Sequence, residues 1–127
     1  MTGGGPPKVF VGMPVYNGAR FIDQAIASIR AQTLKEFVLL IADNASTDGT
    51  EAICRRHAAE DARIRYVRHP QNIGAPGNWN YVLDHASGAY FKWATANDTV
   101  TPDMLALCAA ALDAEPAAVL AQGKTIL

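Results

Sequence analysis

The sequence predicts an α/β domain with a mostly parallel β-sheet and helices on both of its faces. Apolar segments of strand length alternate along the chain with segments whose apolar residues recur at helical spacing. The segment Phe37–Ala42 is apolar at every position, as in a strand that helices cover on each side. A regular alternation of strands and helices favours parallel strands joined by right-handed crossovers.

Five strands are expected: Val9–Met13, Phe37–Ala42, Ile64–Arg68, Tyr90–Ala94 and Ala118–Gln122. Pro14 is expected to end the first strand, because proline has no N–H group to donate within a sheet. The third strand alternates between apolar and charged residues, which is typical of a strand near the edge of a sheet.

Four helices are expected between the strands. The first has one apolar face, formed by Ile22, Ala25, Ile26 and Ile29. The second begins at Thr50 and continues through Cys54.

The third helix is expected to open at Gly74–Gly77 and to end at Ser87–Gly88, where glycine permits a left-handed cap. Its apolar positions are Trp79, Val82, Leu83 and Ala86. The fourth begins with Thr101 as its cap, Pro102 at its first position and Asp103 in its first turn. Its expected buried face consists of Leu105, Cys108, Ala109 and Leu112.

Length and charge narrow the classes of protein. The 127 residues suit one domain, and we expect residues 1–7 to be a flexible lead and residues 8–127 to form that domain. The net charge is −1 and Lys and Arg form no stripe, so a nucleic acid is not an expected partner. No segment has the length and apolarity of a signal peptide or a membrane span. The expected location is cytoplasmic, with attachment to the periphery of a membrane left open.

Cysteines and histidines are not expected to form a catalytic or metal site. Cys54 and Cys108 lie at apolar helical positions and lack metal-site spacing. We interpret them as small buried or half-buried residues of a protein in a reducing compartment, with a disulfide or redox pair as the alternative. His57, His69 and His85 stand at unrelated positions, and each is expected to have a surface or packing role.

Polar side chains gather in the loops that follow the strands. In an open parallel sheet, ligands bind outside the carboxyl ends of the strands. The loops in that position carry Tyr16, Asn17, Asp43, Asn44, Asp48, Asn72, Asn78, Asn80, Asn97 and Asp98. Each of these residue types is common in turns for local reasons, so it is their convergence at one edge that predicts a binding site.

Three acidic positions allow different interpretations. Asp43 closes an apolar strand, where it either accepts hydrogen bonds from a nucleotide base or sugar hydroxyl or caps the following turn. Asp48 precedes the helix start at Thr50 and is interpreted as a structural residue that binds backbone N–H groups. Asn97 and Asp98 together offer two oxygen donors to a hard cation such as Mg²⁺ or Mn²⁺.

Several well-known motifs are missing from the sequence. The first strand–helix turn, at 14–19, contains one glycine and therefore lacks the Gly-x-Gly-x-x-Gly dinucleotide fingerprint. The chain also contains no Gly-x-x-x-x-Gly-Lys-Ser/Thr phosphate loop and no Gly-x-Ser-x-Gly nucleophile elbow.

A set of loop motifs stands in a fixed order along the chain. They are Val-Gly-Met-Pro-Val-Tyr-Asn-Gly at 11–18, Ala-Gln-Thr at 31–33, Asp-Asn-Ala-Ser-Thr-Asp-Gly-Thr at 43–50, Asn-Ile-Gly at 72–74, Phe-Lys-Trp at 91–93, Asn-Asp at 97–98 and Thr-Pro-Asp at 101–103. Each motif is weak alone, but together they resemble the opening of family 2 glycosyltransferases, from about Lys8 to the last residue, Leu127.

This resemblance implies a GT-A nucleotide-diphosphosugar fold of Rossmann-like type and sugar transfer to an acceptor hydroxyl, usually with inversion. The donor is commonly a UDP-sugar, and the implied donor-binding residues are Pro14, Tyr16, Asn17, Asp43, Asn72, Gly74, Asn78, Asn97 and Asp98. Pro14, Tyr16 and Asp43 would meet the base and ribose. The segment that ends at Asp98 matches the family's Asp-x-Asp region, so the resemblance implies Mg²⁺ or Mn²⁺ bound by Asp98 and Asn97.

One departure from the family pattern concerns the metal. The pattern often reads Asp-x-Asp-Asp, but residues 95–98 are Thr-Ala-Asn-Asp, so Asn97 replaces the usual carboxylate. Two unit charges about 4 Å apart interact by roughly 4 kcal/mol at an effective dielectric constant near 20, and a neutral amide gives up part of that. We therefore expect free metal to bind weakly, and to bind together with the nucleotide.

The resemblance also places the catalytic base in the second half of the domain, which we expect to lie beyond Leu127. No catalytic residue is therefore assigned in this chain, whose expected role is that of a donor-binding half with little or no transfer activity by itself. The acceptor, whether a saccharide, a lipid-linked molecule or a protein, is not indicated. An incomplete sheet would leave an edge strand open to pairing with a second copy.

Two other functions remain as alternatives. The first is a nucleotide-binding or assembly module without catalysis, which Asn97 and the expected absence of the second half favour. The second is a sugar-1-phosphate nucleotidyltransferase, which would need a glycine-rich loop with Arg and Lys after the first strand. Residues 16–20 do not supply such a loop.

Overall fold

The computed structural model describes residues 7–115 and confirms the expected alternation of strands and helices. The elements are β1 (Val9–Val15), α1 (Ile22–Arg30), β2 (Phe37–Asp43), α2 (Thr50–Glu60), β3 (Ile64–Arg68), α3 (Ala75–His85), β4 (Tyr90–Trp93) and α4 (Met104–Ala114). The expected strand Ala118–Gln122, the last residue Leu127 and residues 1–6 of the expected lead lie outside the described residues.

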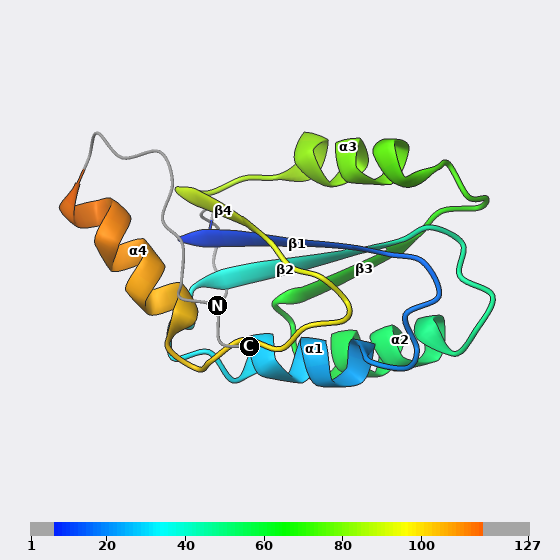
Figure 1. The fold of residues 1–127 in the computed structure, drawn as a ribbon, viewed down its shortest axis with the longest axis horizontal. Coiled ribbons are helices and arrows are strands. Elements are labelled where there is room, and N and C mark those ends of the chain that lie inside the picture. The colour runs from blue at the N-terminus through cyan, green and yellow to red at the C-terminus, as the bar shows by residue number, and fades with distance from the viewer. Residues whose placement is uncertain (1–6, 116–127) are drawn as a thin grey trace.

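The described strands form one parallel sheet in the order β3-β2-β1-β4. Helix α3 covers one face of this sheet, while α1 and α2 cover the other (Figure 1). Helix α4 lies against the amino ends of β1 and β4, where Asp113 binds Lys8 and the Tyr90 hydroxyl (Figure 1). This arrangement confirms the α/β class with helices on both faces, and β3 lies at an edge as expected.

The sheet separates two apolar clusters. The larger one packs β1 and β2 against α1 and includes Met13, Ile26 and Ile41, each 0% exposed. The smaller one packs the other face against α3 through Phe10, Leu40, Ala42 and Val82. Gly12 permits this second contact, because a Cβ there would overlap Val82 Cγ1.

Pro14 does not end β1, which continues to Val15 in register with Asp43. The reason lies in the direction of the proline nitrogen. The carbonyl of Gly12 accepts from the Ala94 N–H on the β4 side, and Pro14, two residues on, faces the same side. Pairing with β4 stops at Gly12, so the missing N–H of Pro14 interrupts no ladder.

Helix α4 begins later than the sequence predicts. Its N-cap residue is Asp103, no side chain caps it, and Thr101 and Pro102 lie in the preceding turn. The carbonyl groups of Thr101 and Pro102 accept hydrogen bonds from the Gln32 side chain and the Thr33 backbone, respectively. These contacts hold the turn outside the helix.

The outer face of α3 also differs from the prediction. Val82 is buried, but Trp79 and Leu83 are 45% and 50% exposed. The Trp79 ring packs in a tilted arrangement against Trp93 of β4, with ring centroids 4.4 Å apart. Gly88 has the expected positive φ, although the helix itself ends earlier, at His85.

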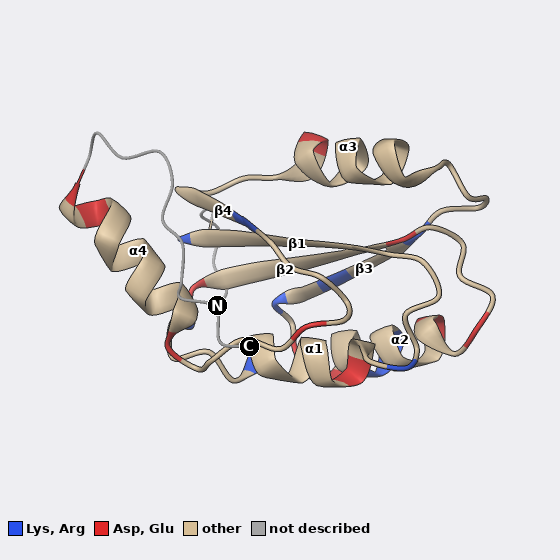
Figure 2. Ribbon diagram, viewed as in Figure 1, with Lys and Arg blue, Asp and Glu red and all other residues tan. Residues whose placement is uncertain are grey.

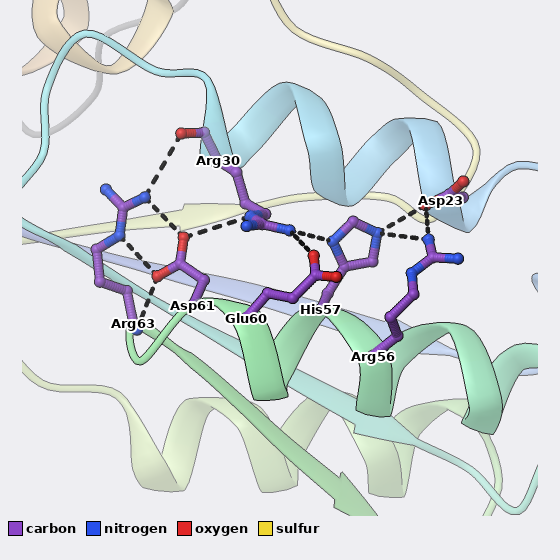
Figure 3. Close-up of polar contacts among 7 residues, drawn as sticks. All are labelled: Asp23, Arg30, Arg56, His57, Glu60, Asp61 and Arg63. Carbon is purple, nitrogen blue, oxygen red and sulfur yellow. Dashed lines mark hydrogen bonds and ion pairs between the residues drawn. The ribbon is translucent and has the colours of Figure 1, made fainter.

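A polar network joins α1 to α2 (Figure 3), and acidic and basic segments are interspersed along these two helices (Figure 2). His57 is 4% exposed, with Nε2 2.7 Å from Asp23 Oδ1 and Nδ1 3.0 Å from Arg30 Nη1. Because arginine only donates, Nδ1 accepts and Nε2–H donates to Asp23, a bond that lowers the pKa of this carboxyl. The expected packing role of His57 is thereby confirmed.

Cys54 is buried and Cys108 half-buried, and both are free. None of the helices within residues 7–115 is long and apolar enough to cross a membrane. In the same range, β4 is paired on one side only, by β1, and the expected self-association through a sheet edge stays a prediction.

Candidate functional site

The loops after β1, β2 and β3 leave the sheet at the same level. Val15, Asp43 and Arg68 stand side by side in the register of the three strands. Strand β4 ends three residues lower, because Trp93 pairs with Gly12. Its loop nevertheless reaches the same edge, where Ala96 is buried against Gly18.

Four hydrogen bonds lock the β1–α1 loop onto the β2–α2 loop. Asn17 donates its N–H to Ser46 Oγ at 2.8 Å, and its side-chain Oδ1 accepts the Thr47 N–H at 2.8 Å. The N–H groups of Gly18 and Ala19 donate to Thr50 Oγ1 and Asp48 Oδ2. Asn17 has a φ of 53°, a left-handed conformation that asparagine tolerates better than most residues. The first loop is therefore held by the second at successive backbone positions.

Asp43 is 0% exposed, and both of its carboxylate oxygens accept hydrogen bonds within the protein. Oδ1 accepts the Ser46 N–H at 2.9 Å, and Oδ2 accepts the Tyr66 hydroxyl at 2.6 Å. Burial and the Asp43 carboxylate both raise the pKa of Tyr66, which keeps this hydroxyl protonated as a donor. Of the two interpretations drawn from the sequence, the structure contains the turn cap.

Asp48 has the structural role expected of it. Its Oδ1 accepts the Thr50 N–H at 3.0 Å at the start of α2, while Oδ2 reaches across to Ala19. Burial opposes ionisation of Asp48, but the hydrogen bonds from Thr50 and Ala19 outweigh it and lower its pKa. Asp48 therefore fastens both the start of α2 and the neighbouring loop.

The β3–α3 loop is fastened to the same assembly by Asn44 and Asn78. Asn44 accepts the Ile73 N–H at 2.8 Å and donates to the Gly74 carbonyl at 3.2 Å. Asn78, which is 2% exposed, donates to the Ala42 carbonyl and accepts from His69 Nε2 at 2.8 Å. Gly74 takes a φ of 83° at the start of α3, a conformation in which a side chain would be strained.

The exposed residues of the edge are a second group. Tyr16 is 52% exposed, and Asn17, Asn72, Asn97 and Asp98 are also exposed. Asn72 accepts the Gly74 N–H at 2.8 Å through Oδ1. Pro14 is half-buried beneath them.

Asp98 differs from the other acids of the edge because its only side-chain hydrogen bond found in residues 7–115 comes from its own loop. Thr95 Oγ1 donates to Oδ2 of Asp98 at 2.7 Å. Asn97 lies beside it and is exposed. One carboxylate and one amide oxygen suit a hard cation that takes its remaining ligands from a bound anion. Within the described range, no group of three or more His, Cys, Asp or Glu side chains could hold a metal ion.

The catalytic base is expected beyond Leu127, and that residue itself lies past Glu115, the last residue that the structure describes. The described part of the chain therefore does not test where the base lies. The position of the base stays a prediction, and the geometry reported above concerns the donor side alone.

Sequence reasoning missed Tyr66 as a part of this edge, and it did not single out Ser46 within the loop at 43–50. Tyr66 is a strand residue, and its contact with Asp43 depends on the pairing of β2 with β3. The sequence identified Asn44 as a loop residue, but its hydrogen bonds to the backbone at 73–74 follow only from the fold.

The chain is similar in sequence and in fold to several known proteins. The protein EpsE of Bacillus subtilis (strain 168) is 36% identical over 100 residues, which cover 78% of this chain and 36% of EpsE. The crystal structure of S. aureus TarS 1-349 in complex with UDP-GlcNAc matches with a TM-score of 0.79 at 25% identity, over 86% of this chain and 32% of that one. TarS 1-349 has also been solved with UDP.

A further solved structure is the mannosyltransferase PcManGT from Pyrobaculum calidifontis in complex with GDP-Man and Mn²⁺. It matches with a TM-score of 0.58 at 30% identity, over 65% of this chain and 25% of that one. The chain thus spans about a third of the length of EpsE and of TarS 1-349. The sequence profile of Glycosyl transferase family 2 matches residues 10–126, and the chain belongs to this family.

Proposed function

We propose that this chain binds a nucleotide-diphosphosugar, with UDP as the nucleotide, for transfer of the sugar to an acceptor hydroxyl. The observation that carries the proposal is the carboxyl edge of the sheet, where interlocked loops present exposed polar and aromatic side chains in a family 2 domain. The similarity to TarS, solved with UDP and with UDP-GlcNAc, supports the choice of nucleotide.

The base and ribose are assigned to the first three loops. Tyr16, Asn17 and Asn72 are exposed and can contact a ligand directly, with Pro14 and Gly74 forming the backbone beside them. Asp43 and Asn78 are buried, and their hydrogen bonds hold the loops from behind. In this proposal their contribution to nucleotide binding is the shape of the pocket.

The diphosphate is assigned to the loop that carries Asn97 and Asp98. These two residues would hold Mn²⁺ or Mg²⁺, the former being present in the PcManGT structure. When bound, such an ion stabilises the negative charge of the departing nucleoside diphosphate. Asp98 supplies a carboxylate for it, and Asn97 a neutral oxygen in place of a second one. Because this donor set is small, we expect the metal to bind together with the nucleotide or after it.

Only the donor side of the reaction is assigned to the described residues. In the reaction we propose, the acceptor oxygen forms a bond to the anomeric carbon as the bond to the diphosphate breaks, and a carboxylate base beyond Leu127 takes the acceptor proton. The acceptor and the identity of the base stay unassigned, since the chain spans about a third of its longer relatives. We accordingly expect the 127-residue chain to bind donor nucleotide but to transfer sugar poorly.

A thermal-shift panel tests the binding proposal. The ligands are UDP, GDP, UDP-GlcNAc and GDP-mannose, each with and without Mn²⁺, and the variants are Tyr16→Ala and, as control, Leu107→Ala. Leu107 is 62% exposed on α4, at the opposite end of the sheet. UDP compounds should stabilise the parent and the control but not Tyr16→Ala. Absence of any shift with UDP compounds, or an equal shift in all three proteins, would contradict the proposal.

A non-catalytic nucleotide-binding module remains the second candidate because of Asn97. It differs from a transferase in the fate of the donor. The comparison needs a version of the chain extended beyond Leu127, because the 127 residues alone are expected to transfer sugar poorly. Release of UDP from UDP-GlcNAc by the extended version, in the presence of Mn²⁺ and simple saccharide acceptors, favours the transferase, whereas tight binding without release favours the module.

A further inference from the structure

Gln32 is a fully buried polar residue, 0% exposed, immediately beyond the end of α1. It belongs to the Ala-Gln-Thr motif at 31–33, which lies away from the loops that carry the proposed donor contacts. Burying an amide is unfavourable unless its hydrogen bonds are replaced. The partners of Gln32 therefore show which part of the molecule it serves.

The side chain of Gln32 joins the end of α1 to the start of α4. Nε2 donates to the Ser28 carbonyl at 3.1 Å and to the Thr101 carbonyl at 2.7 Å. Oε1 accepts the Leu105 N–H at 3.0 Å. The last carbonyls and first N–H groups of helices lack partners within their helix, and Gln32 serves one of each kind.

Further contacts from α1 hold the same segment. Ser28 Oγ accepts the Val100 N–H at 3.2 Å, and the Thr33 N–H donates to the Pro102 carbonyl at 2.7 Å. In Figure 1 the yellow chain between β4 and α4 runs back along α1, which is consistent with these bonds. The segment 100–105 is thus bonded at four backbone positions to Ser28 of α1 and to Gln32 and Thr33, which follow the helix.

Asp98 lies between this tie and a second anchor. Two residues before it, Ala96 is 8% exposed and packs against Gly18, where a Cβ would come within 3.2 Å of it. Two residues after it begins the tied segment at Val100. The path of the chain through 97–99 is therefore set by its two ends, since Asp98 itself bonds only to Thr95 among the described side chains.

We infer that Gln32 is a positioning residue for Asp98, which determines where the carboxylate meets the diphosphate of the donor and its metal. The inference rests on the proposed function. It explains why an amide occupies this position: glutamine provides two donors for two carbonyls and one acceptor for an N–H group. Glutamate would keep the bond from Leu105 but would set an acceptor against the carbonyls of Ser28 and Thr101.

The test compares Gln32→Leu and Gln32→Glu with the control Gln24→Leu, which makes the same exchange at an exposed position of α1. Calorimetry measures the affinity of each protein for UDP with Mn²⁺ and for uridine, which has no diphosphate. Gln32→Leu should weaken UDP–Mn²⁺ binding by about tenfold and leave uridine binding unchanged, with a smaller loss for Gln32→Glu. Amide hydrogen exchange at Val100 should accelerate in both variants and that at Leu105 in Gln32→Leu, while the Ser46 amide stays protected.

The outcomes separate this inference from the proposed function. If the parent binds neither UDP nor uridine, both are overturned. If the parent binds UDP with Mn²⁺ and Gln32→Leu binds it equally well, only the role of Gln32 is overturned. A parallel loss of UDP and uridine binding shows a general structural role and also overturns it. Should Gln32→Leu not fold, Gln32→Glu provides the same comparison.

Discussion

The carboxyl edge of the sheet has two parts that are built differently. The first consists of the loops after β1, β2 and β3, which bond to one another through Asn17, Asn44, Asp43 and Asp48. The second is the loop after β4, which is anchored at its two ends and carries Asp98 between them. The loops of the first part are cross-linked by hydrogen bonds, whereas Asp98 in the second part bonds only to Thr95 among the described side chains.

This difference suggests a division of work between the parts. Loops that are already held in place lose little conformational freedom when they bind a ligand, which suits the proposed recognition of a base and ribose. An exposed carboxylate in a loop that is held only at its two ends can adjust its position to a metal and a diphosphate that bind together. Variants of the first part should therefore change stability, and variants of the second should change ligand affinity.

The largest effect is expected from Asp43→Ala. This substitution removes the acceptor of the Ser46 N–H and of the Tyr66 hydroxyl. Each donor left unpaired inside the protein costs about 1–3 kcal/mol. The free energy of unfolding, measured in urea, should fall by roughly 3 kcal/mol. Asp98→Ala is the control and should stay within about 0.5 kcal/mol of the parent. Equal destabilisation by the two changes would remove the distinction between the parts.

Gly18→Ala tests the contact between the two parts. The new Cβ would lie 2.7 Å from Val15 Cγ2 and 3.2 Å from Ala96 Cβ, so it presses the β4–α4 loop away from β1. Overpacking of this kind costs about 1–3 kcal/mol, and a urea titration should show a loss near 2 kcal/mol. The matched control is Gly49→Ala, where a Cβ would have an ordinary 3.8 Å contact. A change at Gly49 as large as that at Gly18 would show that glycine itself, and not the contact, is responsible.

Asp98→Ala should act on ligand binding alone. Loss of its carboxylate should weaken UDP binding in the presence of Mn²⁺ by about tenfold, or about 1.4 kcal/mol. In EDTA the affinity for UDP should be the same as that of the parent, because the base and ribose contacts lie in the other part. Calorimetric titrations with and without EDTA measure both values. An equal loss in EDTA would place Asp98 in nucleotide recognition instead of metal binding.

Asn97→Asp should produce a gain. A second carboxylate beside Asp98 adds an anionic ligand, and its attraction for a divalent cation outweighs the repulsion between the acids once the ion is bound. We expect Mn²⁺ to bind several-fold more tightly to the protein without nucleotide, as measured by titration of the bare protein. Asn72→Asp, at an exposed position of the other part, is the control and should leave Mn²⁺ affinity unchanged.

Much of the fold could be predicted because its signals are local. The apolar face of α1 and the apolar run of β2 define their elements within a few residues, and the structure contains both. The predictions were wrong where contacts with residues distant in the sequence determine the local structure. Helix α4 starts late because Gln32 and Thr33, about 70 residues away, hold the Thr101–Pro102 turn.

The candidate site shows the same limit. The order of strands and loops indicates that the polar residues converge at one edge, because this follows from parallel topology. Whether a side chain there is buried or exposed depends on register and on neighbours. Asp43, at the end of β2, bonds to Tyr66 and is buried, while Asp98, the same residue type in the loop after β4, is exposed. The residue types alone could not separate these two aspartates.

The smallest expected effect is the pH dependence of the stability that the hydrogen bonds of Asp48 to Thr50 and Ala19 contribute. Burial opposes its ionisation, but hydrogen bonds from Thr50 and Ala19 lower its pKa below the ordinary value of 3.8. The folded state therefore binds this proton more weakly than the unfolded chain does. Ionised Asp48 contributes stability above about pH 4, and that contribution is lost as the pH falls through the lowered pKa of the folded state.

Comparison of the parent with Asp48→Asn isolates this effect, because the other titrating groups are common to both proteins. Urea unfolding should show the parent to be the more stable protein near neutral pH, with the difference shrinking as the pH falls below about 4. The Ala19 amide should exchange faster in Asp48→Asn at neutral pH, since its acceptor becomes uncharged. A stability difference that stays constant over this range would mean that the charge of Asp48 does not hold the first loop to the second, and that the rigidity of this part rests on its neutral hydrogen bonds.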